Sequence, residues 1–264
     1  MVLKWIQLAS FLVIASWALL VSPVSLAFTA GNVNLHSFAQ AKKIALKIHK
    51  DHATTIYCGC RYEGKTVDLR SCGYQAHHDF KRAARLEWEH VVPAEAFGQS
   101  FSEWRMGAPG CFKNHGRGKS FMKEGRTFKG RKCAETNPEF RRMESDLYNL
   151  WPEIGELNGL RNNFTMAEIP GPGQFGGCHA KVGERKFEPG TGEAKGRVAR
   201  VYLYMGLSYP GRGIVSNKNE KLFEAWDKAN PVTPWECERA RRIENVQGNP
   251  NPILKARCSG RAFF

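Results

Sequence analysis

The chain has 264 residues, and 42% of them are hydrophobic, so it can form the core of one large or two small globular domains. Its 39 Lys and Arg residues outnumber its 25 Asp and Glu residues, which gives a formal net charge of +14. This charge excludes a preference for polycations and favours polyanionic partners such as nucleic acids. Charge alone fits adhesion to an anionic cell envelope equally well.

The N-terminal segment is typical of a cleaved signal peptide. A single lysine precedes a nearly uncharged apolar run from Ile6 to Leu26, which ends in the small residue Ala27. We expect cleavage after Ala27, which leaves a mature chain of residues 28–264. An uncleaved membrane anchor is the alternative, because the run is just long enough to span a bilayer, but Pro23 argues against it. The sequence therefore predicts a periplasmic or secreted protein that is free of the membrane after cleavage.

All of the cysteines follow the predicted cleavage point. They are Cys58, Cys60, Cys72, Cys111, Cys133, Cys178, Cys237 and Cys258. An even number in an exported chain predicts up to four disulfides, and we expect Cys58 and Cys60 to have different partners, although the spacing leaves the pairing open. Zinc binding is the alternative, but no C-x-x-C pair occurs and C-x-C is poor ligand spacing.

The first predicted element is a helix from Ser37 to His52, with Ser37 as its cap and apolar residues at helical spacing. The segment Thr55–Asp68 combines aromatic and β-branched residues with glycines and cysteines, which predicts short strands. The segment Arg85–Val92 is predicted to be a strand that runs into a loop at Pro93.

Residues 106–133 are rich in Gly, Lys and Arg and lack an apolar period, so they predict a long loop between two cysteines. A helix is predicted from Pro138 to about Leu150, because proline suits the first helical turn and apolar residues follow at helical spacing. Asn149 would then lie near the end of that helix.

Three helices are predicted in the C-terminal half. The apolar segment Val198–Leu207 favours a helix over a buried strand, and the segment Asn217–Lys228 places its large apolar residues on one face. Thr233 and Glu236 predict a capping box, with Pro234 at the first position of a helix that extends to about Gln247. No internal repeat or linker divides the chain, so we expect one α+β domain from residue 28 to the C-terminus.

One short segment carries residues suited to catalysis. Glu89 and His90 place a carboxylate beside an imidazole, close to where Pro93 ends the predicted strand. Adjacent strand residues point to opposite faces, so the two side chains meet at one site only if the backbone bends there. Without further information, a structural histidine is the better interpretation. No zincin, Gly-x-Ser-x-Gly or Walker motif competes with this segment.

Three blocks of the sequence resemble the endonuclease I family of periplasmic and secreted bacterial nucleases. The segment Glu87–Ala94 reads EWEHVVPA and is followed by Phe97 and Gly98. The second block reads DLYNLWP at 146–152 and continues as GELNGLRN at 155–162. The third, from Phe223 to Ile243, resembles the C-terminal helix of the family, so the similarity covers most of the mature chain.

The resemblance implies a single mixed domain, stabilised by disulfides, with a ββα-metal nuclease centre. Glu89 and Asn149 would bind one divalent cation through oxygen atoms, with Mg²⁺ as the expected ion and Ca²⁺ or Mn²⁺ as substitutes. His90 would be the general base that activates water, and Arg131 would bind the cleaved phosphate, giving 5′-phosphate products. Two roles have simpler alternatives, because Asn149 could cap its helix and Arg131 could be a solvated surface charge.

The sequence thus favours a metal-dependent, sequence-nonspecific endonuclease that acts as a monomer on double-stranded DNA, with RNA as an additional candidate substrate. By the same resemblance, the duplex would be approached from its minor groove and bent. The alternative is a non-catalytic, basic, exported protein that binds DNA or an anionic envelope. The joint occurrence of Glu89, His90 and Asn149 in these contexts favours the enzyme.

Overall fold

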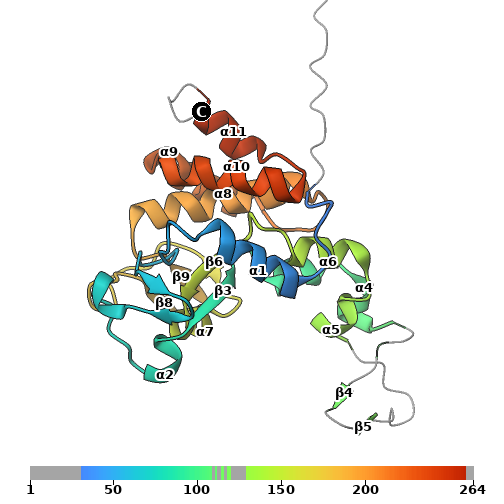
Figure 1. The fold of residues 1–264 in the computed structure, drawn as a ribbon, viewed down its shortest axis with the longest axis horizontal. Coiled ribbons are helices and arrows are strands. Elements are labelled where there is room, and N and C mark those ends of the chain that lie inside the picture. Colours follow the sequence, from blue (N-terminus) through green and yellow to red (C-terminus); the bar gives the residue numbers. More distant parts are fainter. Residues whose placement is uncertain (1–30, 109–110, 112–113, 116–117, 120–128, 260–264) are drawn as a thin grey trace, which may run out of the picture.

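The computed structural model describes residues 31–108, 111, 114–115, 118–119 and 129–259 (Figure 1). The predicted signal peptide, residues 1–27, and much of the predicted loop at 106–133 lie outside these residues. In the described part, helices and short strands surround one hydrophobic core, which confirms the predicted α+β fold. Among the described helices, none combines the length and apolar composition that a bilayer span requires.

Four C-terminal helices form one layer of the molecule (Figure 1). They are α8 (Gly192–Ser208), α9 (Asn217–Ala229), α10 (Pro234–Gln247) and α11 (Pro252–Cys258). The predicted helices are confirmed, and α8 is longer than predicted because the Thr191 hydroxyl caps it by accepting from the amide of Ala194. The predicted capping box is present: the Thr233 hydroxyl and the Glu236 carboxylate each accept from the other residue's backbone amide.

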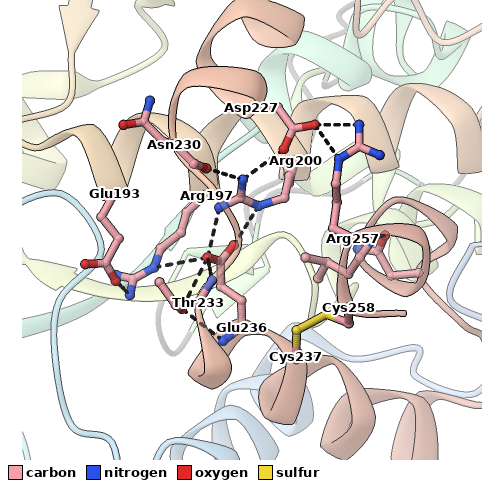
Figure 2. Close-up of polar contacts among 12 residues, drawn as sticks. Glu193, Arg197, Arg200, Asp227, Asn230, Thr233, Glu236, Cys237, Arg257 and Cys258 are labelled. Atoms are coloured by element: carbon pink, nitrogen blue, oxygen red, sulfur yellow. Dashed lines mark hydrogen bonds and ion pairs between the residues drawn. A yellow bond between two sulfur atoms is a disulfide. The ribbon is translucent and has the colours of Figure 1, made fainter. Parts of the chain in front are cut away.

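A buried ion cluster joins these helices (Figure 2). Arg200 of α8, with 1% of its side chain exposed, donates to both carboxylate oxygens of Glu236 at 2.8 Å and to Asp227 at 2.9 Å. Arg257 of α11 donates to the other oxygen of Asp227 at 2.8 and 3.0 Å. Because each buried carboxylate faces at least one guanidinium, the cluster can remain charged away from water.

The centre of the molecule is a two-stranded antiparallel sheet followed directly by a helix. Strand β3 (Leu86–His90) pairs with β6 (Leu150–Ile154), and α7 (Gly155–Arg161) begins at the residue after β6. A Cβ atom at Gly155 would lie 2.4 Å from the carbonyl oxygen of Arg82, so only glycine lets α2 (Phe80–Ala83) approach this closely. This ββα unit was expected from the family resemblance.

The helix predicted from Pro138 to Leu150 is shorter than predicted. Helix α6 covers Pro138–Glu144, and Leu150 instead begins β6, so Asn149 precedes a strand and does not end a helix. The chain leaves the helix because Asp146 is fully buried and accepts hydrogen bonds from three side chains, on α8, on the residue after α8 and on α10. These are Tyr204 at 2.8 Å, Tyr209 at 2.7 Å and Gln247 at 3.0 Å. The apolar periodicity continued across this turn, and tertiary hydrogen bonds overrode it.

The N-terminal elements largely follow the prediction. Helix α1 (Phe38–Ile48) begins after Ser37, whose side chain caps it, and ends four residues before the predicted boundary at His52. Strands β1 (Tyr62–Glu63) and β2 (Thr66–Val67) are short strands, as predicted, and they pair antiparallel. The remaining elements before the second block are η1 (Leu69–Cys72), α3 (Ala94–Gly98), α4 (Ser102–Met106), β4 (Asn114–His115), β5 (Gly118–Lys119) and α5 (Arg131–Ala134).

A second, three-stranded sheet lies between α7 and α8 in the sequence. It consists of β7 (Thr165–Met166), β8 (Lys181–Gly183) and β9 (Lys186–Glu188), with β9 in the middle. Strand β7 runs parallel to β9, and β8 runs antiparallel to it. The buried side chain of Phe187, on β9, packs against the ring of Tyr57 with 4.6 Å between the ring centroids.

All eight cysteines form disulfides, which confirms the prediction of four bridges. The pairs are Cys58–Cys178, Cys60–Cys72, Cys111–Cys133 and Cys237–Cys258. Cys58 and Cys60 have different partners, as expected, and the alternative of a zinc site is wrong because no cysteine is free. The first bridge joins segments 120 residues apart, so it ties the N-terminal strands to the second sheet.

Replacing Arg200 with alanine should destabilise the fold strongly, because Glu236 would keep its buried charge without its main partner. We expect the free energy of unfolding to fall by about 3–5 kcal/mol, measured by urea denaturation.

The matched control is Lys132→Ala, which breaks an exposed pair with Glu135 whose lysine side chain is 86% exposed. Its cost should stay below about 1 kcal/mol. A loss for Arg200→Ala as small as that of the control would contradict the role assigned to the buried cluster.

Candidate active site

A polar pocket of about 490 Å³ opens beside the end of strand β3. Residues of seven described elements, α1, α2, β3, α3, α4, α5 and α7, line it. Among the side chains are Phe38 of α1, Arg82 of α2, Glu89 and His90 of β3, Arg131 of α5 and Asn158 of α7. The pocket therefore brings together segments that are up to 120 residues apart in the sequence, and it includes three of the four predicted site residues.

Glu89 lines the pocket, and its two carboxylate oxygens differ in their partners. Its side chain is 4% exposed, and Oε1 accepts the Tyr57 hydroxyl at 2.6 Å and lies 3.3 Å from Nη1 of Arg161. Oε2 has no hydrogen-bond or ion-pair partner among the described residues. Burial raises the pKa of this carboxyl group, while the charge of Arg161 and the bond from Tyr57 oppose the rise. A cation in the pocket would favour the ionised form.

His90 is the last residue of β3, and its ring is oriented by the end of α6. Nε2 lies 2.8 Å from the carbonyl oxygen of Glu144, which is free because the final carbonyls of a helix have no partner within it. A carbonyl oxygen only accepts, so Nε2 carries the proton and Nδ1 keeps its lone pair. Burial, together with the nearby charge of Arg131, lowers the pKa of His90 to about 3, so the ring is neutral near pH 7.

Glu89 and His90 line the same pocket, although they are adjacent residues of one strand. Both residues still pair with β6, Glu89 with Trp151 and His90 with Leu150. The strand ends at His90, and both side chains line the same pocket. The expected bend therefore comes at the strand end, directly after the imidazole.

Arg131 lies on the opposite wall and is oriented by the same helix end. Its Nε donates to the carboxylate of Glu144 at 2.5 Å, while 39% of the side chain stays exposed. Its guanidinium also lies over the ring of Phe38, 5.1 Å from the centroid, and the ammonium of Lys42 lies 4.4 Å from that same centroid. Two cations thus flank the aromatic ring that packs 4.8 Å from the imidazole of His90.

Asn149 does not line the pocket. Its side chain is fully buried, its Oδ1 accepts from the amide of Val92 at 2.7 Å, and its Nδ2 donates to the carbonyl of the same residue at 2.9 Å. This pair of bonds fixes the chain just beyond His90. Both polar atoms of the Asn149 side chain therefore bond to the backbone of Val92, and the side chain is not among those that line the pocket.

Asn158, which the sequence analysis did not select, occupies the pocket instead. Its Nδ2 donates to Oε2 of Glu87 at 3.0 Å, and its own oxygen has no partner among the described residues. Glu87 is in turn held by Arg82 at 2.9 and 3.0 Å, so it is a structural acceptor and not a free surface carboxylate. The missed signal is the strand at residues 150–154. If that strand is recognised in the sequence, Asn158 falls on the helix that follows it in the ββα unit.

These donors fit a hard divalent cation with few protein ligands. One carboxylate oxygen of Glu89 and one amide oxygen of Asn158 line the same pocket. No group of three or more His, Cys, Asp or Glu side chains able to hold a metal occurs within the described part of the chain. A cation here would keep most of its shell as water and substrate oxygens, which suits Mg²⁺.

Comparisons with known proteins all match this chain to bacterial nucleases. Residues 25–258 match the family model described as Endonuclease I. An extracellular deoxyribonuclease of Aeromonas hydrophila is 40% identical over 233 residues, which cover 86% of this chain and 92% of the relative. A periplasmic deoxyribonuclease of the same species is 40% identical over 229 residues, covering 84% and 86%. Endonuclease-1 of Buchnera aphidicola is 39% identical over 230 residues, covering 85% and 82%.

The two asparagines should respond differently to truncation. Asn149→Ala removes two buried hydrogen bonds and leaves both backbone groups of Val92 unpaired, so the free energy of unfolding should fall by about 2–4 kcal/mol. Asn158→Ala removes one part-buried bond and should cost about 1 kcal/mol or less. Thermal or urea unfolding of both variants in EDTA measures this difference without any contribution from a cation.

Equal losses of stability in the two variants would contradict the assignment of Asn149 to the scaffold. Asn149→Asp is a further check, because a carboxylate at this position would face the carbonyl oxygen of Val92. It should destabilise the fold, whereas a true cation ligand would tolerate the added charge.

Proposed function

Because the chain belongs to the endonuclease I family, we propose that it hydrolyses DNA phosphodiester bonds at the pocket of Glu89, His90 and Asn158 without reading base sequence. The protein is a nuclease that depends on a divalent metal, and it is periplasmic or secreted, like its relatives. The observation that carries the proposal is the orientation of His90. Its Nε2 is held by the Glu144 carbonyl, which leaves the Nδ1 lone pair available, and its ring lines the same pocket as Glu89.

In the proposed reaction, His90 acts as the general base. Nδ1 accepts a proton from the water that attacks phosphorus, while Nε2 keeps its proton and its bond to the Glu144 carbonyl. A phosphate anion in the pocket favours the charged imidazolium and so raises the pKa of His90 from its low value in the free protein. The water oxygen bonds to phosphorus as the P–O3′ bond breaks, so the phosphate stays on O5′ as a 5′-phosphate, and the 3′ oxygen leaves and takes a proton from water.

Glu89 and Asn158 are the proposed ligands of the cation, with Mg²⁺ as the expected ion and Ca²⁺ or Mn²⁺ as substitutes. When bound, the cation would supply Lewis-acid stabilisation of the phosphate and of the leaving 3′ oxygen. Asn158 here takes the ligand role expected of Asn149, since Asn158 lines the pocket whereas Asn149 is buried and bonded to the backbone of Val92.

Arg131 and Lys42 are the proposed phosphate contacts. Arg131 has an exposed guanidinium edge beyond its bond to Glu144, which suits the cleaved phosphate. Lys42 forms no ion pair among the described residues, and its ammonium lies 4.4 Å from the centroid of the same Phe38 ring, where it can contact a neighbouring phosphate. Contacts of this kind position a duplex without specifying its sequence, and binding should weaken with salt.

The alternative of a non-catalytic, basic DNA-binding protein is disfavoured by family membership and by the pocket itself. A binding surface has no need for a buried imidazole whose tautomer is set by a helix-end carbonyl. We expect DNA to be the main substrate, RNA to be a further candidate, and the enzyme to act as a monomer.

Plasmid nicking by the mature chain in Mg²⁺ tests the proposal. We expect wild type to cut supercoiled DNA and EDTA to abolish cutting. His90→Ala should cut roughly 10²–10⁴-fold more slowly, because the proton acceptor is lost.

His77→Ala is the matched control, since His77 lies outside the pocket. Binding of plasmid without cutting, in all divalent cations and with the disulfides intact, would support the binding protein instead. RNA added to the same assay measures the second substrate.

The Cys111–Cys133 disulfide should support activity, because Cys133 lies in α5 two residues after Arg131. Replacing both cysteines with serine should lower the stability by about 3 kcal/mol and also reduce cleavage severalfold at a temperature where the variant is folded. Cys237–Cys258 is the control, since it closes a loop of similar length on α10 and α11. Its double serine variant should lose similar stability and keep its cleavage rate, and equal rates in both variants would contradict the prediction.

A further inference from the structure

The two oxygens of the Glu89 carboxylate have different environments. Each carboxylate oxygen can accept in two lone-pair directions. At Oε1 the Tyr57 hydroxyl donates a hydrogen bond at 2.6 Å, and Nη1 of Arg161 lies 3.3 Å away as an ion-pair partner. At Oε2 no described residue donates, and this oxygen is left to the pocket. The protein thus decides which oxygen can meet a cation.

Four contacts hold Tyr57 in place, so its hydroxyl cannot move with the Glu89 carboxylate if that carboxylate rotates. Its side chain is fully buried, its amide donates to Oε2 of Glu153 at 2.8 Å, and its carbonyl accepts from Gly190 at 3.2 Å. Its ring packs against Phe187, and the next residue, Cys58, is tied to the second sheet by a disulfide. The hydroxyl is therefore a fixed donor to Oε1.

Arg161 adds a fixed positive charge on the same side. Its side chain is 1% exposed, and Nη2 donates to the carbonyl of Val91 at 2.5 Å. A metal ion that approached Oε1 would come close to this guanidinium, and the low local dielectric would strengthen the repulsion between the two positive charges. Only the Oε2 side of Glu89 is electrostatically open.

We propose that Tyr57, together with Arg161, restricts Glu89 to coordination through Oε2 alone and thereby makes the pocket prefer Mg²⁺ over Ca²⁺. The inference rests on the proposed function, in which Glu89 binds the cation. Mg²⁺ takes single carboxylate oxygens in a tight octahedral shell, whereas Ca²⁺ accepts bidentate carboxylates in a larger, flexible shell. Tyr57 is a positioning residue that acts on cation choice through Glu89.

The test is calorimetric titration of the mature chain with Mg²⁺ and Ca²⁺ in the absence of DNA. Tyr57→Phe keeps the ring and removes only the hydroxyl, which frees one lone pair of Oε1 for a bidentate contact. We expect the ratio of Mg²⁺ to Ca²⁺ affinity to fall about tenfold, which corresponds to the loss of one charge-assisted hydrogen bond. In cleavage assays, Ca²⁺ should then compete with Mg²⁺ at lower concentration than in wild type.

Tyr74→Phe is the matched control. Tyr74 is also buried and donates its hydroxyl to a glutamate, Oε2 of Glu156 at 2.9 Å, but neither residue lines the pocket. Its affinity ratio should equal that of wild type, and thermal unfolding in EDTA checks that both variants fold. If Tyr57→Phe does not fold, Phe187→Leu replaces it in the test. This change removes the aromatic ring that packs against Tyr57, and it should also lower the ratio of Mg²⁺ to Ca²⁺ affinity.

The outcomes separate the inference from the proposed function. An affinity ratio in folded Tyr57→Phe within about twofold of wild type would overturn the role of Tyr57 and leave the nuclease proposal intact. The same holds for an unchanged ratio in Phe187→Leu if that variant has to be used. If wild type binds neither cation and cuts no DNA, the proposed cation site and the inference both fail.

Discussion

The buried pairing of Arg161 with Glu89 is the contact on which the pocket depends. Two charges removed from water are tolerated only when each has close partners. Arg161 meets this condition by lying 3.3 Å from Glu89 and donating to the carbonyl of Val91, so it joins the end of α7 to the end of β3. The same side chain therefore holds the carboxylate and the backbone that follows His90. A pocket built around this pair is rigid before any substrate or cation arrives.

Helix α6 organises the opposite side through its last residue. Glu144 uses its free backbone carbonyl to orient the imidazole of His90 and its carboxylate to orient Arg131. Both functions require the helix to end at this residue, since a continued helix would use the carbonyl internally. The end of α6 is in turn determined by buried Asp146, whose hydrogen bonds to α8 and α10 lie far from the pocket. The helical layer thus fixes where α6 ends, and the ion cluster drawn in Figure 2 joins the helices of that layer.

The part of the candidate site that could be predicted from the sequence consists of residues that are adjacent in the chain. Glu89 and His90 are neighbours in a short segment, and the resemblance of that segment to a nuclease family was confirmed by the family match. Asn149 and Asn158 belong to the same resembling block, and composition does not distinguish them. Burial does: one amide is used entirely by Val92, and the other lines the pocket. The general-base, ligand and phosphate roles of individual residues remain predictions.

The sequence by itself determined the family, the α+β class, the four disulfides as a number, and the helices whose caps and apolar faces are local signals. Only the tertiary structure decided where α6 ends, which cysteines pair and which asparagine meets the pocket. Local signals depend on residues three or four positions apart, which a sequence displays directly. The other features depend on hydrogen bonds and packing between segments up to 120 residues apart, and only folding brings those segments together.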